Sequence, residues 1–426
     1  MRILPKRRGA AVAAAVALAM IALSGCSAQQ TVDIDVPPQT EAALPADTVT
    51  QLEAAVTAAM TATGSSGAIV GVWVPWSGTW VSGLGTTSIG GSESVTTDMA
   101  FRAGDVTRAM TCDVLYAVAA EGALSVDDSV TKYVSAVPEL ADVTLRQLCD
   151  STSGIGSYAP QLQSLFLSNP ARVWNARELA AYGLSERDDS QPGTVFRDSD
   201  AGYLLLGLAL ERAENESLPS LIDRYISEPL ELPSTRLPAT AAQAPGDGAV
   251  LDGHWSTPDA AGVWNCTEPA DFTTLSSSIG GADSGAVTTI DDLGRYAQAL
   301  ATNALGSEGD GRFATPVPVA ADQPTWLTTT GGAYQAGSLV GQYGSIPGYM
   351  TAAFADPATG MTVAVVLNNS GANQAIAAWL AWELAAIASK APAASGQTAP
   401  EAGLPWTAQQ WHDQIAGNAI CAPPAA

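Results

Sequence analysis

Strand-forming segments stand near both ends of this 426-residue chain, and helical patterns dominate between them, from 105 to about 300. Apolar runs bounded by turn residues predict strands at 67–74, 79–84, 336–341, 349–355 and 361–367. Helices are expected at 47–62, behind an Asp47 cap, and at about 372–388. Since the two groups of strands can share one antiparallel sheet, the pattern predicts an α+β architecture with a helical lobe inserted into it.

The stretch from 99 to 110 reads MAFRAGDVTRAM and predicts a strand that leads abruptly into a helix. The expected helix begins at Asp105, repeats apolar residues along one face and ends at Gly122. An acid at a helix start contributes about 0.5 to 2 kcal/mol through capping and the helix dipole. Arg108 follows three residues later, close enough in a helix to pair with Asp105.

This junction resembles the nucleophile segment of the β-lactamase-related serine hydrolases, which include class C β-lactamases and D-alanyl-D-alanine carboxypeptidases. Further segments match framework motifs of that family in the usual order: 124–134 (LSVDDSVTKYV), 151–154 (STSG), Pro192-Gly193-Thr194 with Phe196 and Gly202-Tyr203, 291–293 (DDL) and 347–349 (PGY). The resemblance covers residues 67–388 and implies a β-lactamase/transpeptidase-like fold, whose antiparallel sheet is flanked by N- and C-terminal helices.

That fold implies a division of the chain into an α/β lobe, an inserted helical lobe and a tail. The α/β lobe is expected from residues 47–104 together with 303–390, and the mainly helical lobe from 105–302. Residues 391–426 are left as a C-terminal extension.

The family's chemistry needs a serine nucleophile and a lysine base at the junction. At the matching positions this chain has Asp105 and Arg108. A carboxylate attacks amides poorly, and a guanidinium with a pKa above about 12 cannot act as a general base at neutral pH. Losing a nucleophile or its base costs roughly a million-fold in turnover, so either change predicts a silent site.

The other two motifs are replaced as well. Where the family has Tyr-x-Asn, the chain reads Asp198-Ser199-Asp200, and where it has His or Lys followed by x-Gly, the chain reads Gln342-Tyr343-Gly344. Only the glycine is retained. The resemblance therefore predicts that Asp105, Arg108, Asp198 and Asp200 form a charge network where the family has its catalytic pocket.

Two alternatives remain open for the pocket. Asp105, Asp198 and Asp200 could together hold a hard cation such as calcium, although Arg108 would neutralise part of their charge. A serine elsewhere could act as the nucleophile, but the Ser129 and Lys132 pair with Ser-x-x-Lys spacing lies in a framework segment that the family places on its surface. No cofactor is implied.

The N-terminus resembles a bacterial lipoprotein signal. A basic start, an apolar run over 10–23 and the sequence LSGC at 23–26 predict cleavage of residues 1–26 before Cys26 and lipidation of that cysteine; an ordinary secretory signal is the alternative. Residues 27–46 are expected to form a tether. The protein is then extracytoplasmic and anchored to the membrane by lipid, and its net charge of −24 disfavours binding to nucleic acid.

Four further cysteines remain in that oxidising compartment: Cys112, Cys149, Cys266 and Cys421. They permit three pairings, and sequence does not choose among them. We expect Cys112 with Cys149, both near the junction, and Cys266 with Cys421, which would fasten the tail; four buried thiols are the alternative.

We therefore expect a membrane-anchored lipoprotein whose β-lactamase-like domain is catalytically inactive. Its expected partner is a peptidoglycan-related ligand or another protein, bound in the cleft or on the surface. The acidic pocket disfavours penicillins and D-Ala-D-Ala termini, because their free carboxylate needs a cationic partner. The alternative is a divergent carboxypeptidase, β-lactamase or esterase with a non-standard active site, for which the fold is the single argument.

Overall fold

The computed structural model describes residues 31–421 except 308 and 402. The described chain from Val32 onward forms one compact unit. The expected signal peptide, Cys26 and the start of the expected tether lie outside the described residues. Among the described helices, none is both long enough and apolar enough to cross a bilayer.

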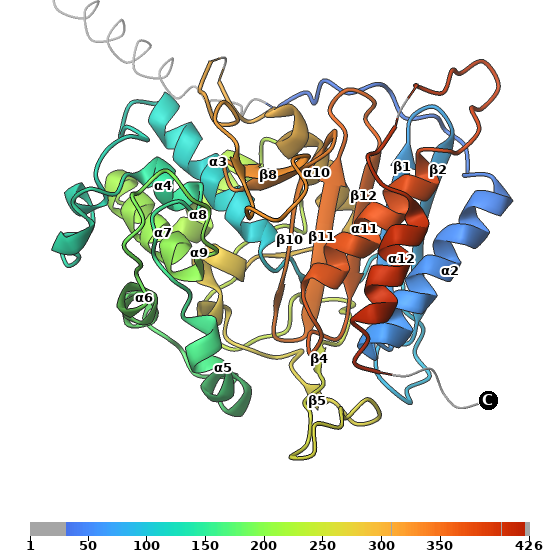
Figure 1. Ribbon diagram of the computed structural model, residues 1–426, viewed down its shortest axis with the longest axis horizontal. Coiled ribbons are helices and arrows are strands. Elements are labelled where there is room, and N and C mark those ends of the chain that lie inside the picture. The colour runs from blue at the N-terminus through green and yellow to red at the C-terminus, as the bar shows by residue number, and fades with distance from the viewer. Residues whose placement is uncertain (1–30, 308, 402, 422–426) are drawn as a thin grey trace, which may run out of the picture. The chain divides into compact units, whose positions relative to one another are not determined.

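An antiparallel sheet forms the centre of the protein, and its strands come from both ends of the chain (Figure 1). Eight strands of the described residues follow the order β2-β1-β12-β11-β10-β9-β8-β7. Their bounds are β1 Gly67–Val74, β2 Gly78–Gly85, β7 Val317–Pro318, β8 Leu327–Thr330, β9 Ala333–Ala336, β10 Leu339–Ile346, β11 Tyr349–Ala355 and β12 Thr362–Leu367. The pairing of Ala68 in β1 with Leu367 in β12 confirms that the two ends share one sheet.

The expected strand at 336–341 is wrong in its bounds. β9 ends at Ala336 and β10 begins at Leu339, so the segment spans a turn between two paired strands. Gly337 lies in this turn with φ +60°, a conformation that favours glycine. The apolar residues on either side of Gly337 belong to different strands.

Three helices cover one face of the sheet in Figure 1: α2 (Ala46–Thr63), α11 (Ala375–Ala388) and α12 (Ala408–Gly417). α11 is apolar nearly all round because it packs between the sheet and α12. α12 lies in the expected C-terminal extension and brings Trp411 against Trp382 of α11. Asp47 does not cap α2; it lies in the first turn, where its charge still complements the helix dipole.

The other face of the sheet packs against a hydrophobic core that the inserted helices enclose. The largest of these helices are α3 (Val106–Ala120), α5 (Ala159–Ser168), α6 (Ala176–Ser185), α7 (Asp200–Glu214) and α10 (Ile290–Thr302). Short pieces complete the lobe: α4 (Leu145–Cys149), α8 (Leu218–Ile222), α9 (Gly281–Ser284), β3 (Phe101–Arg102) paired with β6 (Val287–Thr288), and β4 (His254–Trp255) paired with β5 (Ala270–Asp271). α3 runs through the middle of the core, so nearly all its side chains are buried.

Both expected disulfides are confirmed. Cys112 bonds to Cys149 and joins α3 to the end of α4. Cys266 bonds to Cys421 and joins the loop between β4 and β5 to the residues after α12. The loop that carries Cys266 extends below the sheet in Figure 1, so the second disulfide fastens it to the tail.

Residues 32–45 belong to the stretch that we expected to be a tether, but they lie on the folded body. The Val32 amide donates to the carbonyl of Pro229 at 2.9 Å, and the Leu44 amide donates to Thr79 at 3.2 Å. Leu44 is also buried in the core beside α2. The apolar side chains and backbone groups of this segment therefore find partners that a solvated linker lacks.

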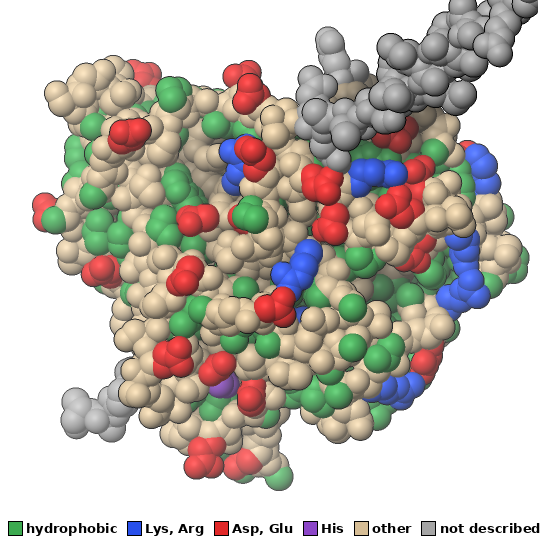
Figure 2. All heavy atoms as spheres, turned by 180° about the vertical axis from the view of Figure 1, so that it is seen from behind, with side chains coloured by type: hydrophobic (Ala, Val, Ile, Leu, Met, Phe, Trp, Pro, Cys, Tyr) green, Lys and Arg blue, Asp and Glu red, His purple; other side chains and the backbone are tan. Residues whose placement is uncertain are grey.

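Acidic side chains are spread over the face of the protein shown in Figure 2, while Lys and Arg form separate small groups. This distribution follows from the excess of Asp and Glu, 42 residues against 18 Lys and Arg.

Candidate ligand-binding cleft

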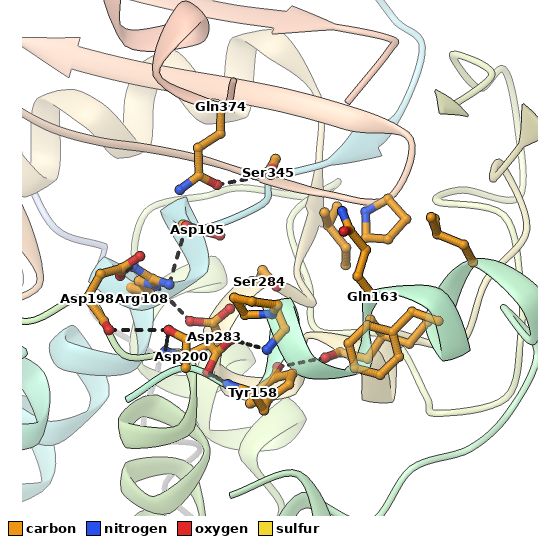
Figure 3. Close-up of a pocket in the computed structure, with 18 of the residues that line it drawn as sticks. Asp105, Arg108, Tyr158, Gln163, Asp198, Asp200, Asp283, Ser284, Ser345 and Gln374 are labelled. Carbon is orange, nitrogen blue, oxygen red and sulfur yellow. Dashed lines mark hydrogen bonds and ion pairs between the residues drawn. The ribbon is translucent and has the colours of Figure 1, made fainter. Parts of the chain in front are cut away.

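A cleft of about 340 Å³ opens where the start of α3, the end of β10 and the helical lobe meet (Figure 3). One wall is polar and contains the start of α3 together with Asp198, Asp200 and Asp283. Apolar side chains also line the cleft, those of Phe166, Leu167, Trp255, Ile346 and Pro347. This volume and this mixture of polar and apolar lining are typical of sites for small ligands.

Asp105 reaches the cleft because of two glycines. Gly104, with φ +54°, turns the chain from β3 into the residues before α3. Gly344 on β10 lies directly behind Asp105, and a Cβ atom there would overlap the aspartate side chain. The one glycine retained from the third motif therefore gives Asp105 room against the bare backbone of the strand.

Asp105 does not form the cap that we expected. It stands at the N-cap position of α3, but its side chain accepts no hydrogen bond from the helix or from any other described residue. Its carboxylate is 5% exposed and contacts Arg108 at 3.4 Å. Burial raises the pKa of Asp105 well above its usual range; Arg108 opposes this effect, and the neighbouring carboxylates add to it.

Arg108 stands where the resemblance places the family's lysine, and it contacts carboxylates on three sides. Its Nε lies 2.7 Å from Asp283 and its Nη1 lies 2.5 Å from Asp198, in addition to the contact with Asp105. Burial alone would lower the pKa of Arg108, but these carboxylates raise it well above its usual value. The guanidinium therefore stays protonated, and its side chain also lies over the ring of Tyr203.

Asp200 stands beside the charge network and does not pair with Arg108. Its carboxylate accepts hydrogen bonds from the backbone amides of Tyr158 at 2.7 Å and Ala159 at 2.9 Å. Burial, and then the charge of Asp283, raise the pKa of Asp200 to about 7. Asp283 on α9 takes the place in the network that we expected Asp200 to fill.

Sequence reasoning missed Asp283. α9 is a short helix whose first residue, Gly281, has φ +50° and packs against Leu204 of α7. This packing brings α9 beside α3, so that Asp283 reaches Arg108. The segment carries no motif that we had matched to the family, and the sequence holds no signal beyond an aspartate two residues after a pair of glycines.

Gln342 lies away from the cleft. Its Nε2 donates to the carbonyl of Gly332 at 2.8 Å, and its Oε1 accepts from the Tyr343 amide at 2.8 Å. Both ends of the amide are thereby used inside the sheet region, where Gln342 is buried. Of the third motif, Gly344 touches Asp105 and the next residue, Ser345, lines the cleft.

The alternative of a bound cation finds no support in the arrangement. The described residues hold no group of three His, Cys, Asp or Glu side chains placed to ligate a metal ion. The guanidinium of Arg108 lies among Asp105, Asp198 and Asp283 and fills the position that a metal ion shared by all three carboxylates would take. Asp200 is directed at backbone amides instead.

Three serines line the cleft, Ser157, Ser284 and Ser345, but no lysine or histidine is among its described lining residues. Ser345 donates to Gln374 at 3.0 Å, and Ser157 donates to the carbonyl of Asp198 at 3.2 Å. The other serine considered from sequence, Ser129, lies outside this cleft, and Lys132 beside it pairs with Asp128 at 2.8 Å. The arrangement supplies polar contacts and charge to a ligand, but no base to activate a hydroxyl group.

A family model described as Beta-lactamase matches residues 52–386, which is most of the chain. The chain therefore belongs to the β-lactamase family. The fold agrees with this assignment, since solved structures similar to this chain include proteins of the same serine hydrolase fold.

The D-stereospecific amidohydrolase from Streptomyces sp. is 25% identical with a TM-score of 0.65, over 76% of this chain and 94% of its own. The octameric penicillin-binding protein homologue from Pyrococcus abyssi is 22% identical with a TM-score of 0.67, over 80% and 77%. D-amino acid amidase from Ochrobactrum anthropi SV3, complexed with L-phenylalanine amide, is 18% identical with a TM-score of 0.61, over 76% and 92%. The last two are similar in fold alone.

Two curated relatives are fimbrial assembly proteins of Dichelobacter nodosus. The probable FimD of serogroup H1 is 28% identical over 143 residues, 32% of this chain and 34% of the relative. The putative FimD of serogroup D is 25% identical over 142 residues, again 32% and 34%. This chain thus matches about a third of the length of these curated relatives.

Proposed function

We propose that the protein is a lipid-anchored, extracytoplasmic member of the β-lactamase family whose cleft binds a ligand without cleaving it. The observation that carries the proposal is Arg108, held protonated among Asp105, Asp198 and Asp283 where the family has its lysine base. A permanently protonated group cannot accept the proton of a nucleophile. The ligand is a cell-wall component or a segment of a protein partner.

The lack of a catalytic base does not prevent the cleft from binding a ligand. It keeps about 340 Å³ of open space, lined by both apolar and charged side chains. Gly344 gives the side chain of Asp105 room beside this space, because a Cβ atom at Gly344 would overlap that side chain. The excess of acidic residues in the chain also disfavours a nucleic acid as the partner.

The absence of catalysis is tested with covalent probes. The purified protein is incubated with a labelled penicillin and with a fluorophosphonate, and an active serine β-lactamase is treated in parallel. Intact mass should show adducts on the control enzyme and an unchanged mass for this protein. A stoichiometric adduct on any serine, including Ser157, Ser284 or Ser345 of the cleft, would establish the divergent hydrolase instead.

The anchor is tested separately, because it depends on residues at the other end of the sequence. In cells supplied with radiolabelled palmitate, the protein should carry label in the membrane fraction. The Cys26→Ser variant should lose the label and leave the membrane. Retention of label by that variant would place the lipid elsewhere or refute the anchor.

A further inference from the structure

The cleft contains more negative than positive charge. Four carboxylates line it, those of Asp105, Asp198, Asp200 and Asp283, whereas Arg108 is the one cation among its described lining residues. The contacts of Arg108 are already divided among three of these carboxylates. One guanidinium therefore leaves an excess of acid that the rest of the described cleft does not balance.

Asp105 is the acid with the weakest interactions. Its contact with Arg108, at 3.4 Å, is the longest of the three, and no described residue donates a hydrogen bond to its carboxylate. The side chain is nevertheless 95% buried, and in Figure 3 it lies at the cleft between Ser345 and Arg108. A buried carboxylate without a hydrogen-bond donor is costly, and a donor from a ligand would remove that cost.

The cleft also has an apolar lining. Trp255 of β4, Phe166 of α5 and Ile346 of β10 line the cleft together with Pro347. A ligand that fits both kinds of lining has a cationic donor at one end and an apolar body at the other. Inorganic cations match only the first of these features.

We propose that the cleft binds an organic cation, a primary ammonium group carried on an apolar body, with the ammonium beside Asp105 and the body against Trp255 and Phe166. This inference rests on the proposed function, because it names the ligand class of the same cleft. The ammonium donates to Asp105 the hydrogen bond that the protein does not supply. A ligand carboxylate at this position would face the four acids instead.

Isothermal titration calorimetry of the full chain with three probes of nearly the same shape tests the proposal: phenethylamine, 2-phenylethanol and phenylacetate. We expect phenethylamine to bind about tenfold or more tightly than the alcohol, and phenylacetate to give no heat of binding. Asp105→Asn should reduce the affinity for phenethylamine about tenfold, while the same change at the exposed Asp322 should leave it unaltered.

Two results would overturn the inference: binding of phenylacetate as tight as that of phenethylamine, or an affinity for the amine that Asp105→Asn does not change. The probe series uses the unaltered protein, so it decides the matter even where the variant fails to fold. Failure here is distinct from failure of the proposed function, since the latter would appear as a covalent adduct on a serine.

Discussion

The guanidinium of Arg108 and the carboxylate of Asp283 meet at 2.7 Å, and their side chains are 7% and 5% exposed. The two residues lie on α3 and α9, which are far apart in sequence and adjacent in the core. A buried ion pair matters to stability mainly because removing one partner leaves the other charge buried without a counter-charge.

Replacing Arg108 by methionine should destabilise the protein by about 3 to 5 kcal/mol, since Asp105, Asp198 and Asp283 lose their common cation. Urea denaturation followed by circular dichroism measures the loss. The matched control is Arg177→Met, because Arg177 is exposed and forms no ion pair with a described residue. Equal stability of the two variants would contradict the importance of the buried network.

Replacing Gly344 by alanine should cost about 1 to 3 kcal/mol, because the added Cβ would overlap the side chain of Asp105. The midpoint of urea denaturation is the measurement. Gly403→Ala is the control, since no heavy atom of the other described residues lies within 4 Å of the position that its Cβ would take. A Gly344→Ala variant as stable as that control would mean that Asp105 moves aside without cost.

The stability of the protein should fall as the pH rises through the range set by Asp200. Its pKa rises from 3.8 to about 7 on folding, so the folded state holds a proton that the unfolded state has released. The stabilisation from this group is complete below about pH 4 and is lost as the pH approaches 7.

Asp200→Asn removes this titration, and its unfolding free energy should vary less between pH 5 and pH 8 than that of the unaltered protein, whatever the absolute stability. Denaturation at several pH values provides the comparison. Asp322→Asn, which changes an exposed acid, should retain the original slope. An unchanged slope in Asp200→Asn would show that another group carries the proton.

Restoring the first motif alone should not restore hydrolysis. The double variant Asp105→Ser with Arg108→Lys introduces a serine and a lysine at the positions that the resemblance matches to the family's nucleophile and base. Asp198 would still stand where the resemblance places the tyrosine, and Gln342 would still bind Gly332. We expect turnover of a chromogenic cephalosporin to remain at the level of the unaltered protein. Appreciable turnover would show that the rest of the pocket is already competent.

The fold could be predicted from sequence because its signals are local. The strands of the two chain ends carry continuous apolar runs, and each framework motif stands in the family's order. The error at 336–341 arose because Gly337 was read as part of a strand, whereas its positive φ makes a turn. The spacing of apolar residues does not indicate whether the backbone angle φ is positive or negative.

The cleft was less predictable, because its geometry depends on packing between distant segments. Arg108 could be placed from its spacing to Asp105, but its contact with Asp283 depends on how α9 lies against α3. In the same way, the two amides that bind Asp200 belong to residues 158 and 159, which have no pattern that marks them as donors. Spacing in the sequence predicts which residues are neighbours on one helix, but it does not predict which residues of two different helices are in contact.

The position of β1 between β2 and β12 has a consequence for biosynthesis. When β1 and β2 leave the ribosome, the strand that must pair with the free edge of β1 has not yet been translated. A lone hairpin is marginally stable, and pairing between distant segments is slow. β1 therefore acquires its second neighbour in the sheet only after residues 362–367 of β12 have been translated.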